Sequence, residues 1–154
     1  GIVENCRFER IKGAAIACGP QYAFWREAGW VRNIVIRNNK FKDNGYGYSS
    51  PVDARGSYRP GCIVVSAQLT QYDKVFPGNR NIMIENNVIE GSPFAGIFVL
   101  GASNVRIIGN KLFNTTGAGF EAGSDLGFSG MAPIWILQSK DVELSENLII
   151  PAVP

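Results

Sequence analysis

The chain has 154 residues, a length sufficient for one domain with a substantial core. Apolar residues make up 45% and charged residues 18%, which is typical of globular rather than disordered proteins. The net charge of +2 is too small to indicate a nucleic-acid partner or a polybasic membrane surface, and no apolar run approaches the roughly 20 residues that span a bilayer. Histidine is absent, which excludes a Ser-His-Asp triad and the commonest zinc ligand from this stretch.

A short motif recurs along the chain. Each copy alternates apolar with other residues and ends with asparagine two positions before a large apolar residue. Such alternation predicts a β-strand with one buried face, and asparagine suits a tight turn because its amide can bond the local backbone. The four full copies are 33–41, 81–89, 104–112 and 141–149, and a fifth copy ends at Cys6-Arg7-Phe8.

The spacing of the motif is regular once loops are allowed for. Asn87 and Asn110 are 23 residues apart, and the other intervals are longer by the length of the loops that they contain. A second apolar strand follows the motif in each coil, at Ile16, Ile63, Ile97 and Ile134. A period in the low twenties with two or three short strands predicts an all-β solenoid, a right-handed parallel β-helix of about four to five coils.

Two other folds fit the pattern less well. A leucine-rich repeat has a similar period, but its leucine signature is absent. A β-sandwich is the structural alternative, and it would not explain the constant interval. We therefore treat residues 1–154 as a single β-helix slice. Because the chain begins at Gly1 in the middle of the pattern, we expect it to be a fragment of a longer solenoid, with the missing coils of the same parent chain as its neighbours.

Stacking of the coils would place one asparagine above the next. We expect these side chains to bond from coil to coil inside the solenoid, with Cys6 in the same column as a small buried thiol. The members of this internal ladder are Asn39, Asn87, Asn110 and Asn147. On the outward face, the same alignment predicts two ion pairs of little energetic value, Arg37 with Glu85 and Arg106 with Glu143.

Four insertions interrupt the coils, at 19–32, 42–61, 66–80 and 114–132. Insertions in a solenoid usually form its binding surface. The coil between Asn87 and Asn110 carries none, so the loops on either side would stand roughly 10 Å apart and form a groove of about the width of a sugar chain. Its floor would be the outward column Ala17, Val64, Phe98 and Trp135. The two aromatic rings would stack on sugar faces, or, alternatively, the insertions or a missing domain would cover them.

The insertions combine carboxylates with tryptophan, tyrosine and arginine. Glycoside hydrolysis needs two carboxyl groups, and we select Glu27 and Asp53 as the catalytic candidates, although Glu121 and Asp125 are also present and spacing identifies no pair. The predicted substrate-binding residues are Trp25, Arg26, Trp30, Tyr46, Tyr48, Tyr72, Asp73, Phe98 and Trp135. No metal or cofactor is predicted, because the acidic calcium cluster that a pectate lyase would need is missing from the outward columns.

The Asn-x-x-Phe coils resemble the pectate-lyase-like superfamily of right-handed parallel β-helices over nearly the whole chain. Residues 4–113 resemble, more narrowly, bacterial exo-acting α-1,3-galactosidases that remove terminal galactose from blood-group-B-type glycans. The likeness lies in ENCRFERIKGAAI, in AFWREAG with its Trp25-Arg26-Glu27-Ala28-Gly29 segment, and in VRNIVIRNNKF. This resemblance implies an inverting hydrolase, secreted or periplasmic, that uses aspartates as acid and base and acts on an oligosaccharide or polysaccharide without a metal.

One feature of that family is missing. Its catalytic carboxylates include adjacent aspartates, and this chain contains no Asp-Asp pair. The catalytic coils would then lie upstream of Gly1, or the parent is a different enzyme. Two alternatives remain open: a polysaccharide lyase or uronate epimerase, which would use Arg55, Tyr58 or Arg59, and a non-catalytic glycan-binding β-helix.

Overall fold

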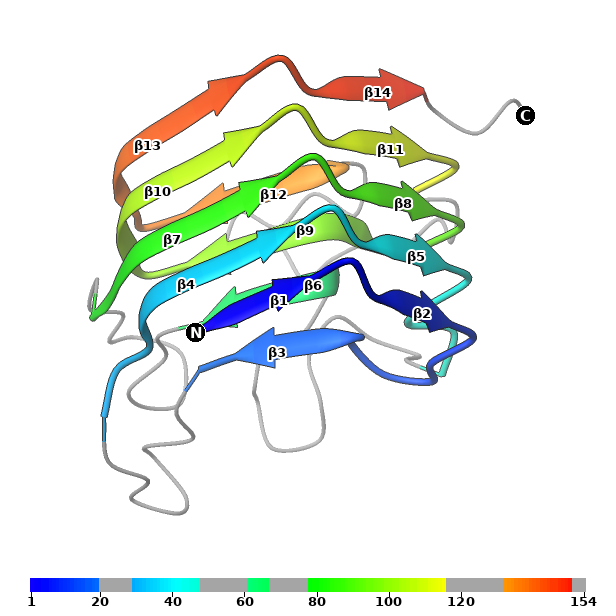
Figure 1. Ribbon diagram of the computed structural model, residues 1–154, viewed down its shortest axis with the longest axis horizontal. Coiled ribbons are helices and arrows are strands. Elements are labelled where there is room, and N and C mark those ends of the chain that lie inside the picture. The colour runs from blue at the N-terminus through cyan, green and yellow to red at the C-terminus, as the bar shows by residue number, and fades with distance from the viewer. Residues whose placement is uncertain (20–28, 48–60, 67–77, 116–131, 151–154) are drawn as a thin grey trace.

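The computed structural model describes residues 1–19, 29–47, 61–66, 78–115 and 132–150, which form fourteen strands and no helix (Figure 1). The strands belong to three parallel sheets, and the chain visits them in turn, one strand of each per coil. Sheet A contains β1 (Ile2–Glu4), β4 (Arg32–Arg37), β7 (Asn79–Glu85), β10 (Ala102–Ile108) and β13 (Lys140–Ser145). Sheet B contains β2 (Arg7–Glu9), β5 (Lys40–Lys42), β8 (Val88–Glu90), β11 (Lys111–Phe113) and β14 (Leu148–Ile150). Sheet C contains β3 (Ile16–Cys18), β6 (Gly61–Ser66), β9 (Ala95–Leu100) and β12 (Ile134–Leu137).

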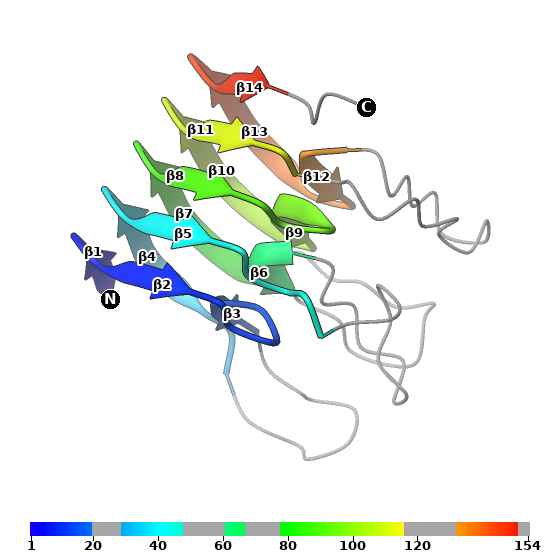
Figure 2. The same cartoon turned by 90° about the vertical axis from the view of Figure 1, so that its right-hand side faces the viewer.

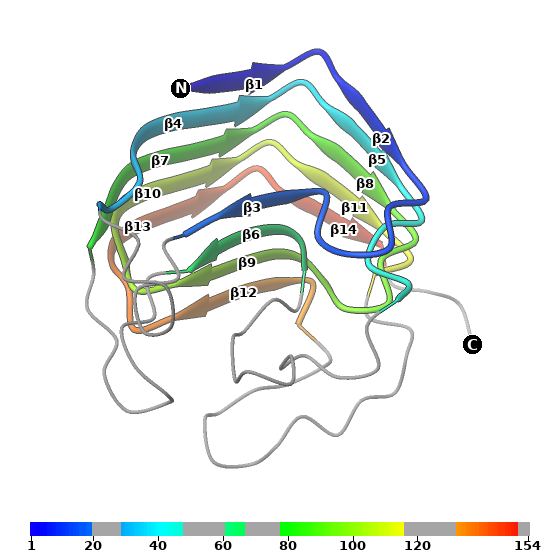
Figure 3. The ribbon, with the colours of Figure 1, turned by 90° about the horizontal axis from the view of Figure 1, so that it is seen from below.

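The predicted β-helix is confirmed. Every strand pairs in parallel with the equivalent strand of the next coil, so the coils rise as a stack from β1 at one end to β14 at the other (Figure 2). Seen along the stack, sheets A and B meet at an angle and sheet C lies across from them (Figure 3). No helix of the described residues is long and apolar enough to cross a membrane.

The register agrees with the alignment of the repeat. Ile84 of β7 pairs with Ile36 of β4 and with Ile107 of β10, and all three side chains are fully buried. Phe41 stacks on Phe8 with ring centroids 4.9 Å apart. On the last described coil, however, Leu144 and Ile149 occupy the same inward columns and are 53% and 42% exposed, because β13 and β14 are the edge strands of their sheets among the described residues.

The asparagine ladder fixes the corner between sheets A and B. Each ladder asparagine accepts a hydrogen bond through its Oδ1 from the backbone N–H of the residue one coil earlier: Asn87 from Asn39, Asn110 from Asn87 and the partly buried Asn147 from Asn110, each at 3.0 Å. The side-chain amides bond one another at 3.0–3.1 Å and also donate to backbone carbonyls, such as Nδ2 of Asn87 to the oxygen of Ile36 at 2.9 Å. The predicted ladder is therefore confirmed, since these buried polar groups all find partners.

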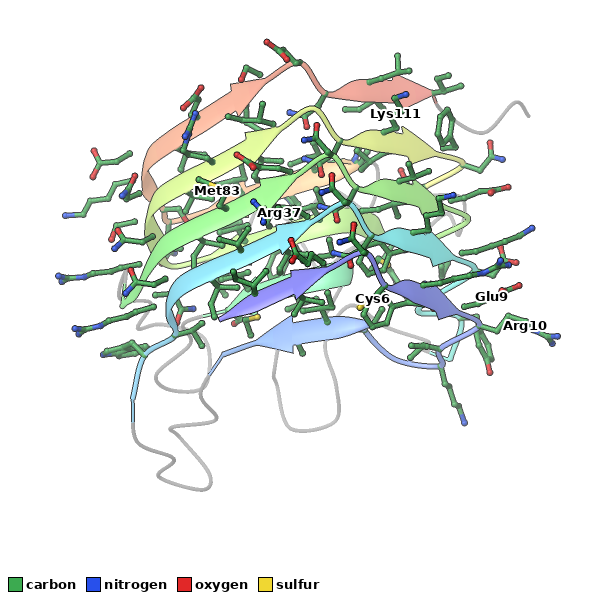
Figure 4. The ribbon with its side chains drawn as sticks, in the orientation of Figure 1. Cys6, Glu9, Arg10, Arg37, Met83 and Lys111 are labelled. Atoms are coloured by element: carbon green, nitrogen blue, oxygen red, sulfur yellow. The ribbon has the colours of Figure 1, made fainter. Side chains whose placement is uncertain are left out.

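Two details of the predicted columns were wrong. Cys6 continues the ladder through its backbone N–H, which donates to Oδ1 of Asn39 at 3.0 Å, but on this first coil its thiol is exposed rather than buried. Arg37 pairs with Glu4 on the preceding coil, 2.7 Å away, although Glu85 is its strand neighbour on the other side. Arg106 pairs with Glu143 at 2.9 Å, as predicted. Arg37 and Met83 project from the outer face of sheet A, whereas Lys111 belongs to sheet B (Figure 4).

Left-handed backbone at the corners explains why asparagine often stands directly before the ladder asparagine as well. The residue before each ladder position has φ between 51° and 66°, a region that asparagine and glycine tolerate best: Asn5, Asn38, Asn86, Gly109 and Glu146 have this conformation. A second, exposed ladder starts sheet A, where Nδ2 of Asn81 donates to Oδ1 of Asn33 at 2.7 Å and Nδ2 of Asn104 donates to Oδ1 of Asn81 at 2.9 Å.

The three free thiols differ in how deeply they are buried. Cys6 is exposed, Cys18 at the end of β3 is partly buried and Cys62 in β6 is 1% exposed. Burial raises the pKa of the Cys18 thiol, and it raises the pKa of the Cys62 thiol to about 12, although a hydrogen bond from Asn44 opposes this shift. The reactive thiolate form is therefore disfavoured at the two sheet C positions.

Removing one member of the buried ladder should be costly. Asn110→Ala deletes bonds to the N–H of Asn87 and to the carbonyl of Ile84, leaving two buried backbone groups without partners. We expect the free energy of unfolding to fall by about 2–4 kcal/mol. Guanidinium unfolding followed by far-ultraviolet circular dichroism measures this change. Asn104→Gly is the control, because it removes an exposed ladder bond while keeping the left-handed backbone, and equal losses in both variants would contradict the role of the buried ladder.

The exposed ladder can be extended by one residue. Asp141 has φ 54° and comes directly after Lys140, which pairs with Ser103. It therefore stands in the column of Asn104, but its carboxylate has no N–H to donate. Asp141→Asn should supply that donor and raise the free energy of unfolding by about 0.5–1 kcal/mol. Thermal or guanidinium unfolding of the variant checks this, with Asp141→Ala as the comparison. A variant no more stable than the parent chain would show that Asn104 gains nothing from a donor there.

The thiols should react in the order of their exposure. At pH 8 we expect iodoacetamide to modify Cys6 first, Cys18 more slowly and Cys62 only after unfolding, because a raised pKa lowers the fraction of thiolate at that pH. Mass spectrometry of peptides after timed labelling measures the three rates. Denaturant should make the rates converge, and fast modification of Cys62 in the folded chain would contradict its position in the core.

Candidate functional site

Long connections flank sheet C at both ends of its strands. The connections from β3 to β4 and from β6 to β7 lead from sheet C to sheet A, whereas those from β5 to β6 and from β11 to β12 lead from sheet B into sheet C. The four predicted insertions fall on these connections. Their greater part, residues 20–28, 48–60, 67–77 and 116–131, lies outside the described residues, so their extent stays a prediction.

The connections to sheet A begin side by side. Gly19, just after β3, lies so close to the backbone of Ser66 at the end of β6 that a Cβ on the glycine would overlap the Ser66 carbonyl oxygen. β3 and β6 are paired strands, with Cys18 opposite Val65. Segments 47 residues apart in the sequence therefore leave sheet C at one point.

The same two connections also end side by side. The indole of Trp30 lies against the backbone of Gly78, where a Cβ would collide with the ring. One residue on, the backbone N–H of Val31 donates to Oδ1 of Asn79 at 3.0 Å, and the N–H of Arg80 donates to the Val31 carbonyl at 3.0 Å. We call this place, formed by Trp30, Val31, Gly78 and Asn79, the tryptophan junction.

Asn79 is the polar residue that sequence analysis missed at this junction. Its side chain is fully buried, and its Nδ2 is the one buried side-chain nitrogen or oxygen of the described residues that lacks a hydrogen-bond partner. A buried amide donor without a partner costs free energy, so such a group is either strained or available to a ligand or water. The sequence held a weak signal, because Asn79 stands two positions before the repeat asparagine Asn81.

The opposite end of sheet C carries the predicted tyrosine. Asn44 is buried and accepts a bond from the N–H of Ile11 through Oδ1 at 2.9 Å, which holds the chain against the first coil as it leaves β5. The backbone of Gly47 bonds the Lys12 carbonyl at 2.9 Å. Between them, Tyr46 is 59% exposed and is the one largely exposed aromatic side chain among the described residues. Trp30 and Tyr46 therefore lie at opposite ends of the sheet C strands rather than together.

Of the two alternatives for the aromatic residues of the expected groove floor, exposure is wrong, although Ala17 at the start of the same column is exposed. Val64, Phe98 and Trp135 do face away from the main core, since they form a separate cluster, and Phe98 contacts Trp135 edge to face with ring centroids 5.6 Å apart. Their side chains are nevertheless buried, with Phe98 0% and Trp135 7% exposed. A ring without exposed surface cannot stack on a sugar, so the alternative, in which this column is covered, is the one that the structure supports.

The remaining predicted site residues lie outside the described residues. They are Glu27, Asp53, Trp25, Arg26, Tyr48, Tyr72 and Asp73, together with the alternative residues Arg55, Tyr58 and Arg59 and the carboxylates Glu121 and Asp125. Within the described ranges, no group of three or more His, Cys, Asp or Glu side chains could hold a metal ion.

Sequence analysis also missed a set of cations at the start of sheet A. Arg32 pairs with Arg80, Arg80 with Ser103 and Ser103 with Lys140. The signal was available, because each of these residues stands directly before the first residue of a repeat copy. We call Arg32, Arg80, Ser103 and Lys140 the basic column.

Comparison with known proteins identifies related sequences. The chain is 24% identical over 152 residues to the alpha-1,3-galactosidase B of Akkermansia muciniphila, an alignment that covers 97% of this chain and 17% of the relative. It is 26% identical over 115 residues to the alpha-1,3-galactosidase B of Bacteroides thetaiotaomicron, covering 75% of this chain and 18% of the relative. The chain thus spans less than a fifth of the length of these curated relatives. No solved structure matches it.

The family assignment follows from the fold and from one further match. Residues 32–150, most of the chain, match the family described as the right handed beta helix region. The same residues contain the parallel strands from β4 to β14 and the complete buried asparagine ladder. The chain belongs to the right-handed β-helix family.

Proposed function

We propose that this chain is part of a carbohydrate-active enzyme, a glycoside hydrolase of the exo-acting, inverting α-galactosidase type that binds glycan beside sheet C. The observation that carries the proposal is the similarity to two proteins named alpha-1,3-galactosidase B, one of which aligns with 97% of the chain, insertions included. The relatives are bacterial, and a secreted or periplasmic location would suit an enzyme that meets external glycans.

The scaffold supports this role physically. The coils are held in register by buried amides, so that the insertions leave from and return to fixed points. Trp30 at the tryptophan junction and Tyr46 at the other end of sheet C offer aromatic surface to a sugar ring, and the neighbouring Nδ2 of Asn79 is a donor without a protein partner among the described residues. Rigid positioning of a ring is what hydrolysis at a single glycosidic bond requires.

The chemistry would be carried by carboxyl groups of the insertions. In an inverting glycosidase, one carboxylic acid protonates the glycosidic oxygen that leaves, while a second carboxylate takes a proton from the water that attacks the anomeric carbon. Glu27 and Asp53 are our candidates for this pair. Their insertions flank sheet C at opposite ends of its strands.

A second candidate function is favoured by one observation. The chain spans only 17–18% of its relatives and contains no Asp-Asp pair, so it would also suit a segment that contributes substrate contacts while proton transfer occurs on other coils. In this case the chain binds glycan without cleaving it.

Conservative replacement of the two carboxylates distinguishes these functions. In a polypeptide that contains this chain, we expect Glu27→Gln or Asp53→Asn to lower kcat for release of galactose from an α-1,3-linked oligosaccharide by about 100-fold or more, because the acid or base is lost while the shape is kept. Proton NMR of the first product tests for inversion. Glu146→Gln, at the corner between sheets A and B, is the charge-matched control.

The possible outcomes separate the alternatives. Unchanged turnover in both variants would refute these carboxylates as acid and base. Binding of the oligosaccharide that falls with Trp30→Ala or Tyr46→Ala, without turnover in any variant, would leave the second candidate function. Absence of both binding and turnover with galactosyl oligosaccharides would refute the proposal.

A further inference from the structure

The basic column runs across four consecutive coils at the start of β4, β7, β10 and β13, the edge of sheet A seen on the left of Figure 1. Arg32, Arg80 and Lys140 are exposed, and Ser103 between Arg80 and Lys140 is 7% exposed. Adjacent coils are about 4.8 Å apart, so the two arginines are direct neighbours and Lys140 stands about 10 Å from Arg80. All four side chains can donate hydrogen bonds, and none is an anion.

This arrangement is unfavourable without an anion. Like charges on directly paired positions of neighbouring strands repel and destabilise a sheet. Three of the other four described arginines are paired with carboxylates, Arg7 with Glu9, Arg37 with Glu4 and Arg106 with Glu143, whereas Arg10 forms no ion pair with a described residue. In the parts of the chain that the structure describes, the three cations of the basic column form no such pair.

The position of the column connects it to the proposed glycan site. Arg32 follows Trp30 by two residues, and Arg80 follows Gly78 by two. Both arginines therefore come directly after the residues of the tryptophan junction. A glycan bound at the junction would therefore meet the column as it extends along the edge of sheet A. The guanidinium groups can each grip a sulfate or a carboxylate with two parallel hydrogen bonds, which lysine cannot do.

We propose that the basic column binds the anionic groups, sulfate esters or carboxylates, of an acidic glycan chain. This inference rests on the proposed glycan function and narrows its substrate class to glycans that carry acidic groups. Arg32 and Arg80 together hold one anionic group, and Ser103 and Lys140 contact the next one along the chain. The net charge of only +2 and the carboxylate of Asp141 beside Lys140 favour this limited contact over a nucleic acid, which needs a broader positive surface.

Binding of defined saccharides to charge variants tests the proposal. The probes are a sulfated heparin oligosaccharide, an unsulfated polygalacturonate oligosaccharide, a neutral α-1,3-galactosyl oligosaccharide and a single-stranded DNA of equal charge. We expect Arg32→Gln with Arg80→Gln to raise the Kd for an acidic saccharide by about tenfold or more and to leave the neutral one unchanged, because exposed arginines add charge-assisted bonds to the anion alone. Circular dichroism should show an unaltered fold, since both side chains are exposed.

A matched control exists on sheet B. Lys40 and Lys111 are exposed on β5 and β11, and the adjacent column alternates Glu9, Lys42 and Glu90. Lys40→Gln with Lys111→Gln removes the same charge and should change the Kd less than about twofold. An equal loss in both double variants, or DNA binding as tight as that of the acidic saccharides, would overturn the proposal.

The two anionic probes identify the source of the charge. Heparin carries both sulfates and carboxylates, and polygalacturonate carries carboxylates alone. Binding of heparin without polygalacturonate therefore assigns the column to sulfate groups, and binding of polygalacturonate as tight as that of heparin assigns it to carboxylates. Failure of the two proposals can be told apart. If the neutral oligosaccharide is cleaved but no acidic one binds, the basic column proposal fails alone; if acidic glycans bind through Arg32 and Arg80 without any binding or cleavage of the neutral one, the galactosidase proposal fails alone.

Discussion

The buried amides at the corner between sheets A and B are the interaction on which the rest of the structure depends. Each ladder asparagine satisfies a backbone N–H of the coil before it and a carbonyl in the interior, so a shift of one residue would leave several buried polar groups unpaired. The apolar alternation excludes the same shift, because a slip of one residue would turn the buried isoleucine and valine side chains to the outer face. The ladder therefore fixes which residues become neighbours.

That register converts separation in sequence into proximity in space. Val31 and Asn79 are 48 residues apart and are joined by a hydrogen bond of 3.0 Å, and the arginines that follow them are paired. The insertions can vary in length and composition without disturbing the coils, because they are anchored at both ends by backbone contacts such as those of Gly19 with Ser66 and of Trp30 with Gly78. In a solenoid of this kind, the stacked coils provide stability and the loops provide the binding surface.

The surface is likewise divided between regions that stabilise the fold and regions that offer groups to a ligand. The outer face of sheet A has ion pairs at Arg37 with Glu4 and at Arg106 with Glu143, whereas the cations at its starting edge, beside the tryptophan junction, form no ion pair with any described residue. The outer face of sheet C carries the cluster of Phe98 and Trp135, which is covered and therefore stabilises rather than recognises. Aromatic side chains contact a ligand only when part of the ring is exposed, and of the two aromatic residues that flank sheet C at its loop junctions, Tyr46 is exposed and Trp30 is half-buried.

The sequence by itself determined the coil. The interval of 23 residues between Asn87 and Asn110, the alternation of the strands and the asparagine before each large apolar residue predicted the sheets, the register and the buried ladder, because these are local patterns repeated along one chain. Only the tertiary structure decided what the end coils and loop junctions do. Cys6 and Leu144 are exposed because they lie on the outermost described coils. Arg37 forms its ion pair with Glu4 rather than with Glu85, and the Phe98 side chain is buried. Burial and pairing depend on which atoms approach from other coils, and a periodic pattern does not contain that information.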